Sequence, residues 1–308
     1  PPDIILNATG FALSAPGADT DRGPFTDTDA PMLQVVFAGS DLERWQSGAN
    51  GLSARDIAMN VALPEVDGRI LARAVSFKGA ARRDDASETD IVAYEPVADR
   101  IDFTADLASA WARLRQTKPT DRRVALVLAN YPNRDGRIGN GVGLDTPAGV
   151  VSTLNAMIEA GYSIKDKPAD GDALVRRLQQ GPTNAGIAAR RIEESLPLPD
   201  YEVFFAALPY PVRMAVTERW GPPDADPMFL PGHTDCGAFA IPAFRCGNIA
   251  IGLQPARGYN IDPTATYHDP DLVPPHNYFA FYGWLRGSFD AHAVTHFGKH
   301  GNLEWLPG

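Results

Sequence analysis

Cysteine is scarce in this chain, because only Cys236 and Cys246 occur among its 308 residues. Their spacing matches neither a zinc ribbon nor a redox pair. So little cysteine argues against a domain held together by disulfides. We therefore expect two buried thiols in a protein of the reducing cytoplasm.

Long hydrophobic runs are also missing. No apolar run approaches the ~18 residues that a membrane-spanning helix needs. The chain begins Pro1-Pro2-Asp3, without a methionine or a signal-like segment, and it stops at Gly308 directly after a motif-rich loop. We therefore expect an internal piece of a longer polypeptide with no membrane span.

The chain has no basic stretch. Its net charge is −10, from 28 basic and 38 acidic side chains. Nothing in it matches the phosphate neutralisation that nucleic-acid binding requires. It also lacks the G-x-x-x-x-G-K-[ST] motif of a P-loop. With 44% hydrophobic and 21% charged residues, the composition is that of a globular protein.

Short apolar runs alternate with segments of helical spacing, which predicts an α/β fold. We expect mainly parallel sheets with flanking helices, arranged as two Rossmann-like or flavodoxin-like subdomains. A break around Lys118-Pro119 sets the predicted domains at 1–118, with long loops, and 119–308. The predicted strands are 4–9, 33–38, 57–63, 71–77, 123–129, 203–208, 249–253 and a buried one at 291–295. The predicted helices are 41–46, 102–117, 148–160, 171–180, 184–194, 212–220 and one that begins at 279–285. Loops are predicted at 14–31 and 80–89.

A glycine-rich loop, residues 130–147, joins a predicted strand to a predicted helix and contains Asn140 and Asp145. Such a loop can hold an anion on backbone N–H groups at the helix N-terminus. Its glycine spacing is not that of a dinucleotide-binding loop. A purely structural loop is an equally good interpretation.

Three groups with metal-binding or acid–base chemistry, His296, His300 and Glu304, follow the last predicted strand. Gly298 and Gly301 between them favour a loop over a helix. Imidazole and carboxylate groups beyond a strand end suit a transiently held metal ion. A second possible ligand cluster is His233, Asp235 and Cys236.

Arg257 also follows a predicted strand end. Its guanidinium can pair with a carboxylate through two hydrogen bonds, although the same segment also fits a surface turn.

Several motifs occur in a familiar order. They are Asn130–Pro132, Gly139–Pro147, Leu253–Pro255 with Arg257–Gly258, Tyr267–Asp269 and His296–Gly308. Together they resemble the large-subunit family of aerobic cobaltochelatase and magnesium chelatase. The resemblance spans most of the chain. Trp305-Leu306 and Arg257 favour the cobalt branch.

The resemblance implies an ATP-dependent metal chelatase of the cytoplasm. It would insert Co²⁺ into hydrogenobyrinic acid a,c-diamide during aerobic cobalamin (vitamin B12) biosynthesis. Two AAA-type partner subunits would bind and hydrolyse ATP with Mg²⁺, which agrees with the missing P-loop.

Residue roles follow from the same resemblance and from the chemistry of metal insertion, which strips water from the ion and removes protons from the ring. His300 and Glu304 are the expected metal-delivery and proton-accepting pair, and His296 is an expected ligand. Arg257, with Arg213, would neutralise corrinoid carboxylates. The remaining expected substrate-binding residues are Gln254, Tyr259, His276, Asn140 and Asp145.

Three other functions fit parts of the sequence. The first is a magnesium chelatase large subunit that inserts Mg²⁺ into protoporphyrin IX. The second is a non-catalytic α/β solute-binding module. The third is a small metallohydrolase that uses His296, His300 and Glu304 as zinc ligands.

Overall fold

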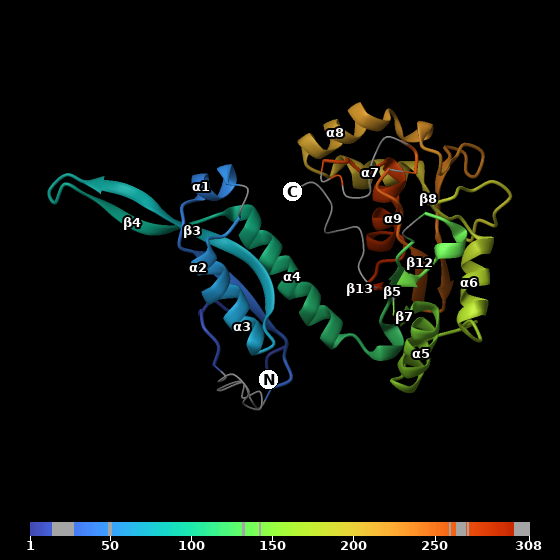
Figure 1. The fold of residues 1–308 in the computed structure, drawn as a ribbon, viewed down its shortest axis with the longest axis horizontal. Helices are drawn as coiled ribbons and strands as arrows, with labels where there is room; N and C mark the ends of the chain where they lie inside the picture. Colours follow the sequence, from blue (N-terminus) through green and yellow to red (C-terminus); the bar gives the residue numbers. More distant parts are fainter. Residues whose placement is uncertain are drawn as a thin grey trace. The chain divides into compact units, whose positions relative to one another are not determined.

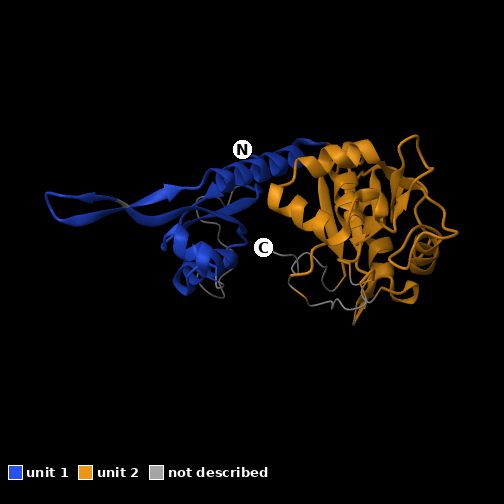
Figure 2. Ribbon diagram, turned by 90° about the horizontal axis from the view of Figure 1, so that it is seen from above, with its two compact units in different colours: residues 1–117 blue, residues 118–308 orange. Residues whose placement is uncertain are grey.

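The structure is a computed structural model that describes residues 1–13, 28–48, 51–130, 133–141, 143–258, 260–262, 269 and 271–298. The chain divides into two compact units, Pro1–Thr117 and Lys118–Gly308 (Figure 2). Each unit combines helices with a sheet that contains parallel strand pairs, which confirms the α/β class. Among the described residues, no helix is long and apolar enough to cross a membrane.

Unit 1 is built on a four-stranded sheet of order β1-β2-β3-β4 (Figure 1). Strands β1 (Ile5–Asn7), β2 (Met32–Ala38) and the first part of β3 (Ile70–Asp84) run parallel, and β4 (Thr89–Pro96) is antiparallel to β3. Six of the seven β2 residues are buried, so this strand is the centre of the unit. The predicted strands at 4–9, 33–38 and 71–77 are confirmed.

The helices of unit 1 are α1 (Leu42–Ser47), α2 (Ala54–Ile57), α3 (Leu63–Val66) and α4 (Ala98–Gln116), with one π-helical turn at Ala58–Ala62 between α2 and α3. The predicted strand at 57–63 is therefore wrong. Ser53 caps this helical segment, its hydroxyl accepting from the N–H of Asp56, and Pro64 sits in the first turn of α3. These helix-starting signals outweigh the β-branched residues between them.

Strands β3 and β4 form a long hairpin that extends from the sheet (Figure 1). The predicted loop at 80–89 is wrong, since only the turn between Asp84 and Thr89 lies outside the strands. Residues 80–84 of β3 are small or charged, and seven of the eight β4 residues are exposed, so no buried apolar face marks this part of the hairpin in the sequence. Its backbone pairing, rather than a buried face, makes it a strand.

Unit 2 contains a four-stranded sheet of order β11-β12-β5-β13. Strands β12 (Ile249–Leu253), β5 (Val124–Leu128) and β13 (Ala293–Phe297) are parallel, and β11 (Ala243–Cys246) is antiparallel to β12. All five residues of β5 and of β12 are buried. The last strand is confirmed, but the expectation that it is buried is wrong, because none of the β13 residues is buried.

Helices cover both faces of this sheet (Figure 1). On one face α5 (Thr146–Glu159) and α6 (Gly171–Gln180) pack against Leu126 and Leu128. On the other face α7 (Leu198–Ala206) and α9 (His276–Arg286) pack against Ala125 and Val127. The helix α8 (Tyr210–Trp220) follows α7. The predicted helices at 148–160, 171–180, 212–220 and 279–285 are confirmed.

A smaller antiparallel sheet, β8-β10-β9, completes unit 2. Its strands are β8 (Glu194–Pro197), β10 (Ala238–Ile241) and β9 (Phe229–Leu230). The predicted strand at 203–208 is wrong, because Pro199 starts helix α7 over that segment. The predicted helix at 184–194 is also wrong, since a tight turn pairs Thr183 with Gly186.

Candidate functional site at the carboxyl edge of the unit 2 sheet

The two central strands of unit 2 send the chain to opposite faces of the sheet. Strand β5 leads to α5 on one face, and its parallel neighbour β12 leads to α9 on the other. Such a reversal between two neighbouring parallel strands marks the place where open α/β sheets usually bind ligands. The segments that follow β5, β12 and β13 therefore define the candidate site.

Asn184 joins the first two of these segments through its side-chain amide. Its Nδ2 donates to Asn130 Oδ1 and to the Gln254 carbonyl, both at 3.0 Å, and its Oδ1 accepts from the Ala256 N–H at 2.9 Å. Asn260 Nδ2 donates to the Asn184 carbonyl at 3.3 Å. The strand ends are thus held apart at a fixed separation by one amide.

The start of the glycine-rich loop is anchored to the end of α6. Asp135 accepts from Thr183 Oγ1 at 2.7 Å and forms an ion pair with Arg190. Burial alone would raise the pKa of Asp135, but hydrogen bonds from Arg190 and Thr183 outweigh it and the pKa is lowered. Gln179 Nε2 also donates to the Asp135 carbonyl. This part of the loop is therefore held by charge-assisted contacts.

The end of that loop forms the two-residue strands β6 (Asn140–Gly141) and β7 (Leu144–Asp145). Asn140 is exposed, and it pairs with Asp145 across the ladder. The Asp145 carboxylate caps α5 by accepting from the Ala148 N–H at 3.1 Å. Because a carboxylate already occupies this helix N-terminus, the geometry favours the structural interpretation of the loop over the anion-binding one.

His296 lies near the carboxyl end of β13 and faces a buried polar pair. Gln254 Nε2 donates to Tyr282 Oη at 3.0 Å, and that oxygen lies 3.5 Å from His296 Nε2, at the outer limit of a hydrogen bond. The two rings stack with centroids 6.3 Å apart. Burial raises the pKa of Tyr282, so its hydroxyl keeps a proton that can be directed to the imidazole.

Arg257 is fully buried, and its Nη1 donates to the Asp269 carbonyl at 3.1 Å. The next residue, Gly258, has a φ of +109° and lies against the Trp220 ring, where a Cβ would overlap the indole. The guanidinium therefore has a structural partner in this state. A role toward a substrate carboxylate stays a prediction.

His276, expected at the substrate, is buried at the start of α9. Its Nε2 lies 2.9 Å from the Gly221 carbonyl, so this nitrogen carries the hydrogen, and its Nδ1 lies 2.6 Å from Tyr201 Oη. Burial lowers the pKa of His276, although the Gly221 carbonyl and Asp226 act in the opposite direction. With both nitrogens engaged inside the core, the geometry favours a structural role.

His300, Glu304 and Tyr259 lie outside the described residues. Within the part of the chain that the structure describes, no group of three or more His, Cys, Asp or Glu side chains is placed to hold a metal ion. This applies to His233, Asp235 and Cys236, which are all exposed. The expectation of two buried thiols is therefore wrong for Cys236 and right for Cys246.

Sequence reasoning missed Asn184 and Tyr282. Asn184 fell inside a predicted helix, although the Pro182-Thr183-Asn184 turn signal was present. Tyr282 lies on a helix, and nothing local in the sequence connects it to His296.

The chain resembles known proteins in sequence and in structure. The family model described as CobN/Magnesium Chelatase matches residues 1–308. The chain belongs to that family. The aerobic cobaltochelatase subunit CobN of Sinorhizobium sp is 58% identical over 307 residues, covering 100% of this chain and 24% of the relative. The CobN subunit of Pseudomonas aeruginosa is 50% identical, covering 99% and 24%.

A solved structure of the family has the same fold. The catalytic subunit of cobaltochelatase from Mycobacterium tuberculosis matches with a TM-score of 0.81 and 38% identity, over 99% of this chain and 26% of that one. Magnesium-chelatase subunits H are more distant, at 28% to 31% identity. The chain spans about a quarter of the length of the curated relatives it matches.

Proposed function

We propose that this chain is part of the large, tetrapyrrole-binding subunit of an ATP-dependent cobaltochelatase. The reaction would insert Co²⁺ into hydrogenobyrinic acid a,c-diamide during aerobic cobalamin biosynthesis, in the cytoplasm. The observation that carries this proposal is the 58% identity over the whole chain to a subunit named for that enzyme.

The cobalt branch is favoured over the magnesium branch by the difference between relatives. Identity to the two CobN subunits is 58% and 50%, whereas identity to magnesium-chelatase subunits H does not exceed 31% among those compared. In both branches the subunit must hold the tetrapyrrole ring while the metal ion loses its bound water molecules. The choice between them therefore concerns the ion and the ring, not the fold.

The carboxyl edge of the unit 2 sheet is the proposed place of this chemistry. His296 stands there beside Tyr282, and the motif containing His300 and Glu304 follows within a few residues. In the proposed reaction these imidazole and carboxylate groups replace water on Co²⁺ and accept the protons that the ring nitrogens lose. Tyr282 and Gln254 orient the His296 ring.

ATP hydrolysis with Mg²⁺ is assigned in this proposal to two AAA-type partner subunits. Support comes from the sequence, which contains no P-loop motif that could cradle a nucleotide triphosphate. Arg257 is proposed to bind a substrate carboxylate. Its Nη1 would then give up the hydrogen bond that it donates to the Asp269 carbonyl. Gln254, Tyr259 and Asn140 remain proposed substrate-binding positions, as do His276 and Asp145, which would have to bind substrate in addition to the structural contacts they make.

The test uses the full-length subunit with its partner ATPases, the corrinoid and Co²⁺. H296A, H300A and E304Q should each lower the rate of cobalt insertion by at least about a hundredfold while corrinoid affinity changes little. The matched control is H233Q, which alters an exposed histidine far from the proposed site in sequence and should leave the rate unchanged. Wild-type rates in all three site variants would contradict the assigned roles, and selective use of Mg²⁺ with protoporphyrin IX would contradict the cobalt branch.

A further inference from the structure

Unit 1 contains a polar cavity that the proposed chelatase chemistry does not use. It has a volume of about 520 Å³ and lies at the carboxyl ends of β1 and β2. Ala8 and Gly10 follow β1, Gly39 and Ser40 follow β2, and Lys78 follows the last β3 residue paired with β2. This is the edge at which parallel α/β sheets bind ligands, and the volume is that of a small-molecule site.

Three cations line the cavity. Arg44 comes from α1, Arg55 from α2 and Lys78 from β3. The ion pairs among the described residues of unit 1 are Arg69–Asp67, Arg83–Asp90 and Arg115–Asp29, so none of the three cavity cations is paired with a carboxylate there. All three side chains are exposed and so open to a ligand, and they gather on one cavity in a chain whose net charge is −10.

Among the described lining residues the one carboxylate, Asp56, already has hydrogen-bond partners. Asp56 Oδ1 accepts from the Gly39 N–H at 3.0 Å and from Asn60 Nδ2 at 3.3 Å, and its Oδ2 accepts from Ser53 Oγ at 2.7 Å. These bonds tie the end of β2 to the helix beside it. The described lining therefore carries three positive charges against one negative charge, and the carboxylate that bears the negative charge accepts three hydrogen bonds within the fold.

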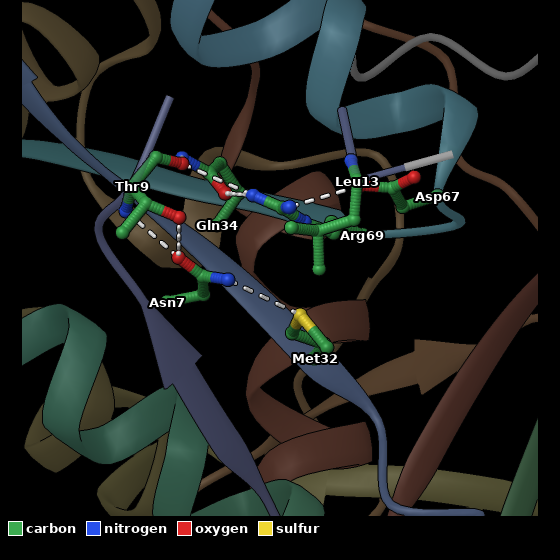
Figure 3. Close-up of polar contacts among 7 residues, drawn as sticks. All are labelled: Asn7, Thr9, Leu13, Met32, Gln34, Asp67 and Arg69. Atoms are coloured by element: carbon green, nitrogen blue, oxygen red, sulfur yellow. Dashed lines mark hydrogen bonds and ion pairs between the residues drawn. The ribbon is translucent and has the colours of Figure 1, made fainter. Parts of the chain in front are cut away.

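The loop that closes one side is held rigidly by a buried network (Figure 3). Arg69 Nη1 donates to the Thr9 carbonyl at 3.0 Å and to Gln34 Oε1 at 3.1 Å, and Gln34 Nε2 donates to the same carbonyl. Phe11, with a φ of +64°, donates its N–H to the Met59 carbonyl at 2.8 Å. The wall is thus preorganised, which reduces the entropy cost of binding.

Aromatic side chains complete the lining. Phe11, Phe37 and Tyr94 are each between 43% and 60% exposed, and the last two contact each other with centroids 5.9 Å apart. Lys78 lies 5.9 Å from the Tyr94 ring centroid. These exposed ring faces can pack against the apolar part of a ligand whose charged groups meet the cations.

We propose that this cavity binds a small molecule that carries two or more phosphate or carboxylate groups. Three cations on separate elements match several charged groups better than one, and Ser40 and Asn60 offer polar atoms beside them. The site belongs to unit 1 and is independent of the metal-insertion site proposed in unit 2.

Calorimetric titration of the 308-residue chain with pyrophosphate and with benzene tricarboxylate tests the proposal. At least one probe should bind, with an affinity that falls as salt is added, and the tighter one identifies phosphate or carboxylate as the natural group. R55A and K78A should each weaken binding about tenfold, and K78R should stay close to wild type.

The matched control is R82A, which removes an exposed cation from the same strand as Lys78 but outside the cavity lining. It should bind like wild type. The proposal is overturned if neither probe binds at millimolar concentration, or if R82A weakens binding as much as R55A and K78A, because the attraction would then belong to the whole surface. Circular dichroism of each variant verifies that it is folded.

Discussion

Replacement of Asn184 by alanine tests whether one amide holds the carboxyl edge of unit 2 together. The substitution removes the three hydrogen bonds to Asn130, Gln254 and Ala256. These partners are at most 3% exposed, so water cannot replace the lost contacts without opening the edge. At about 1 kcal/mol for each buried hydrogen bond, unit 2 should lose about 3 kcal/mol of unfolding free energy.

Differential scanning calorimetry measures this loss. For a unit of this size, ~1 kcal/mol lowers the melting temperature by roughly 2–4 °C, so N184A should lower the unit 2 transition by roughly 6–12 °C. The transition of unit 1 should not move. Hydrogen exchange at the Ala256 amide should also accelerate, because that N–H donates to Asn184.

Asn260 provides the matched control. It is exposed and donates a single 3.3 Å bond to the Asn184 carbonyl, so N260A should cost only about 0.5 kcal/mol. Equal shifts in N184A and N260A would refute the argument, because the central amide would then contribute no more than a surface contact.

Three further changes have defined outcomes. D67A leaves the buried Arg69 guanidinium without its carboxylate and should destabilise unit 1 by about 3 kcal/mol or more in urea unfolding. Iodoacetamide should modify exposed Cys236 alone in the folded chain, since burial raises the pKa of Cys246 to about 11; mass spectrometry should find one adduct. Burial lowers the pKa of His276 below its usual 6.5, so below pH 6.5 the unfolded chain binds a proton that the folded chain does not. Unit 2 should therefore lose stability as the pH falls from 6.5 through the folded pKa.

Controls separate these effects from general damage. D90A removes an exposed carboxylate 3.9 Å from its arginine and should cost less than about 1 kcal/mol. A second iodoacetamide adduct should appear only after unfolding in urea. H276Q should flatten the fall in stability below pH 6.5, and an unchanged slope would assign that pH dependence to other groups.

Prediction from the sequence succeeded where burial is complete and local. All residues of β5 and β12 are buried, so their apolar runs were visible without any tertiary information. It failed where burial is slight or irregular. The segment 203–208 was taken for a strand, but Val203 is 75% exposed on α7 and only Tyr201 of that helix is buried. The part of the β3–β4 hairpin beyond Phe77 is largely exposed and had no buried face to detect.

The candidate site was predictable in part. The positions of Gln254 and His296 at strand ends followed from the order of strands and loops. Their connection through Tyr282, and the bridge that Asn184 makes between two strand ends, depend on contacts between residues far apart in the chain. Such contacts arise from packing and have no signature in a single sequence.

The opposite exits of the chain after β5 and β12 have an evolutionary consequence. The two opposite exits are produced by backbone direction, whereas the core lies between the sheet and its helices. Exposed side chains in the segments after the strands, such as Asn260, can be exchanged at little cost to that core. Proteins that share this fold can therefore come to bind different ligands while the core stays unchanged.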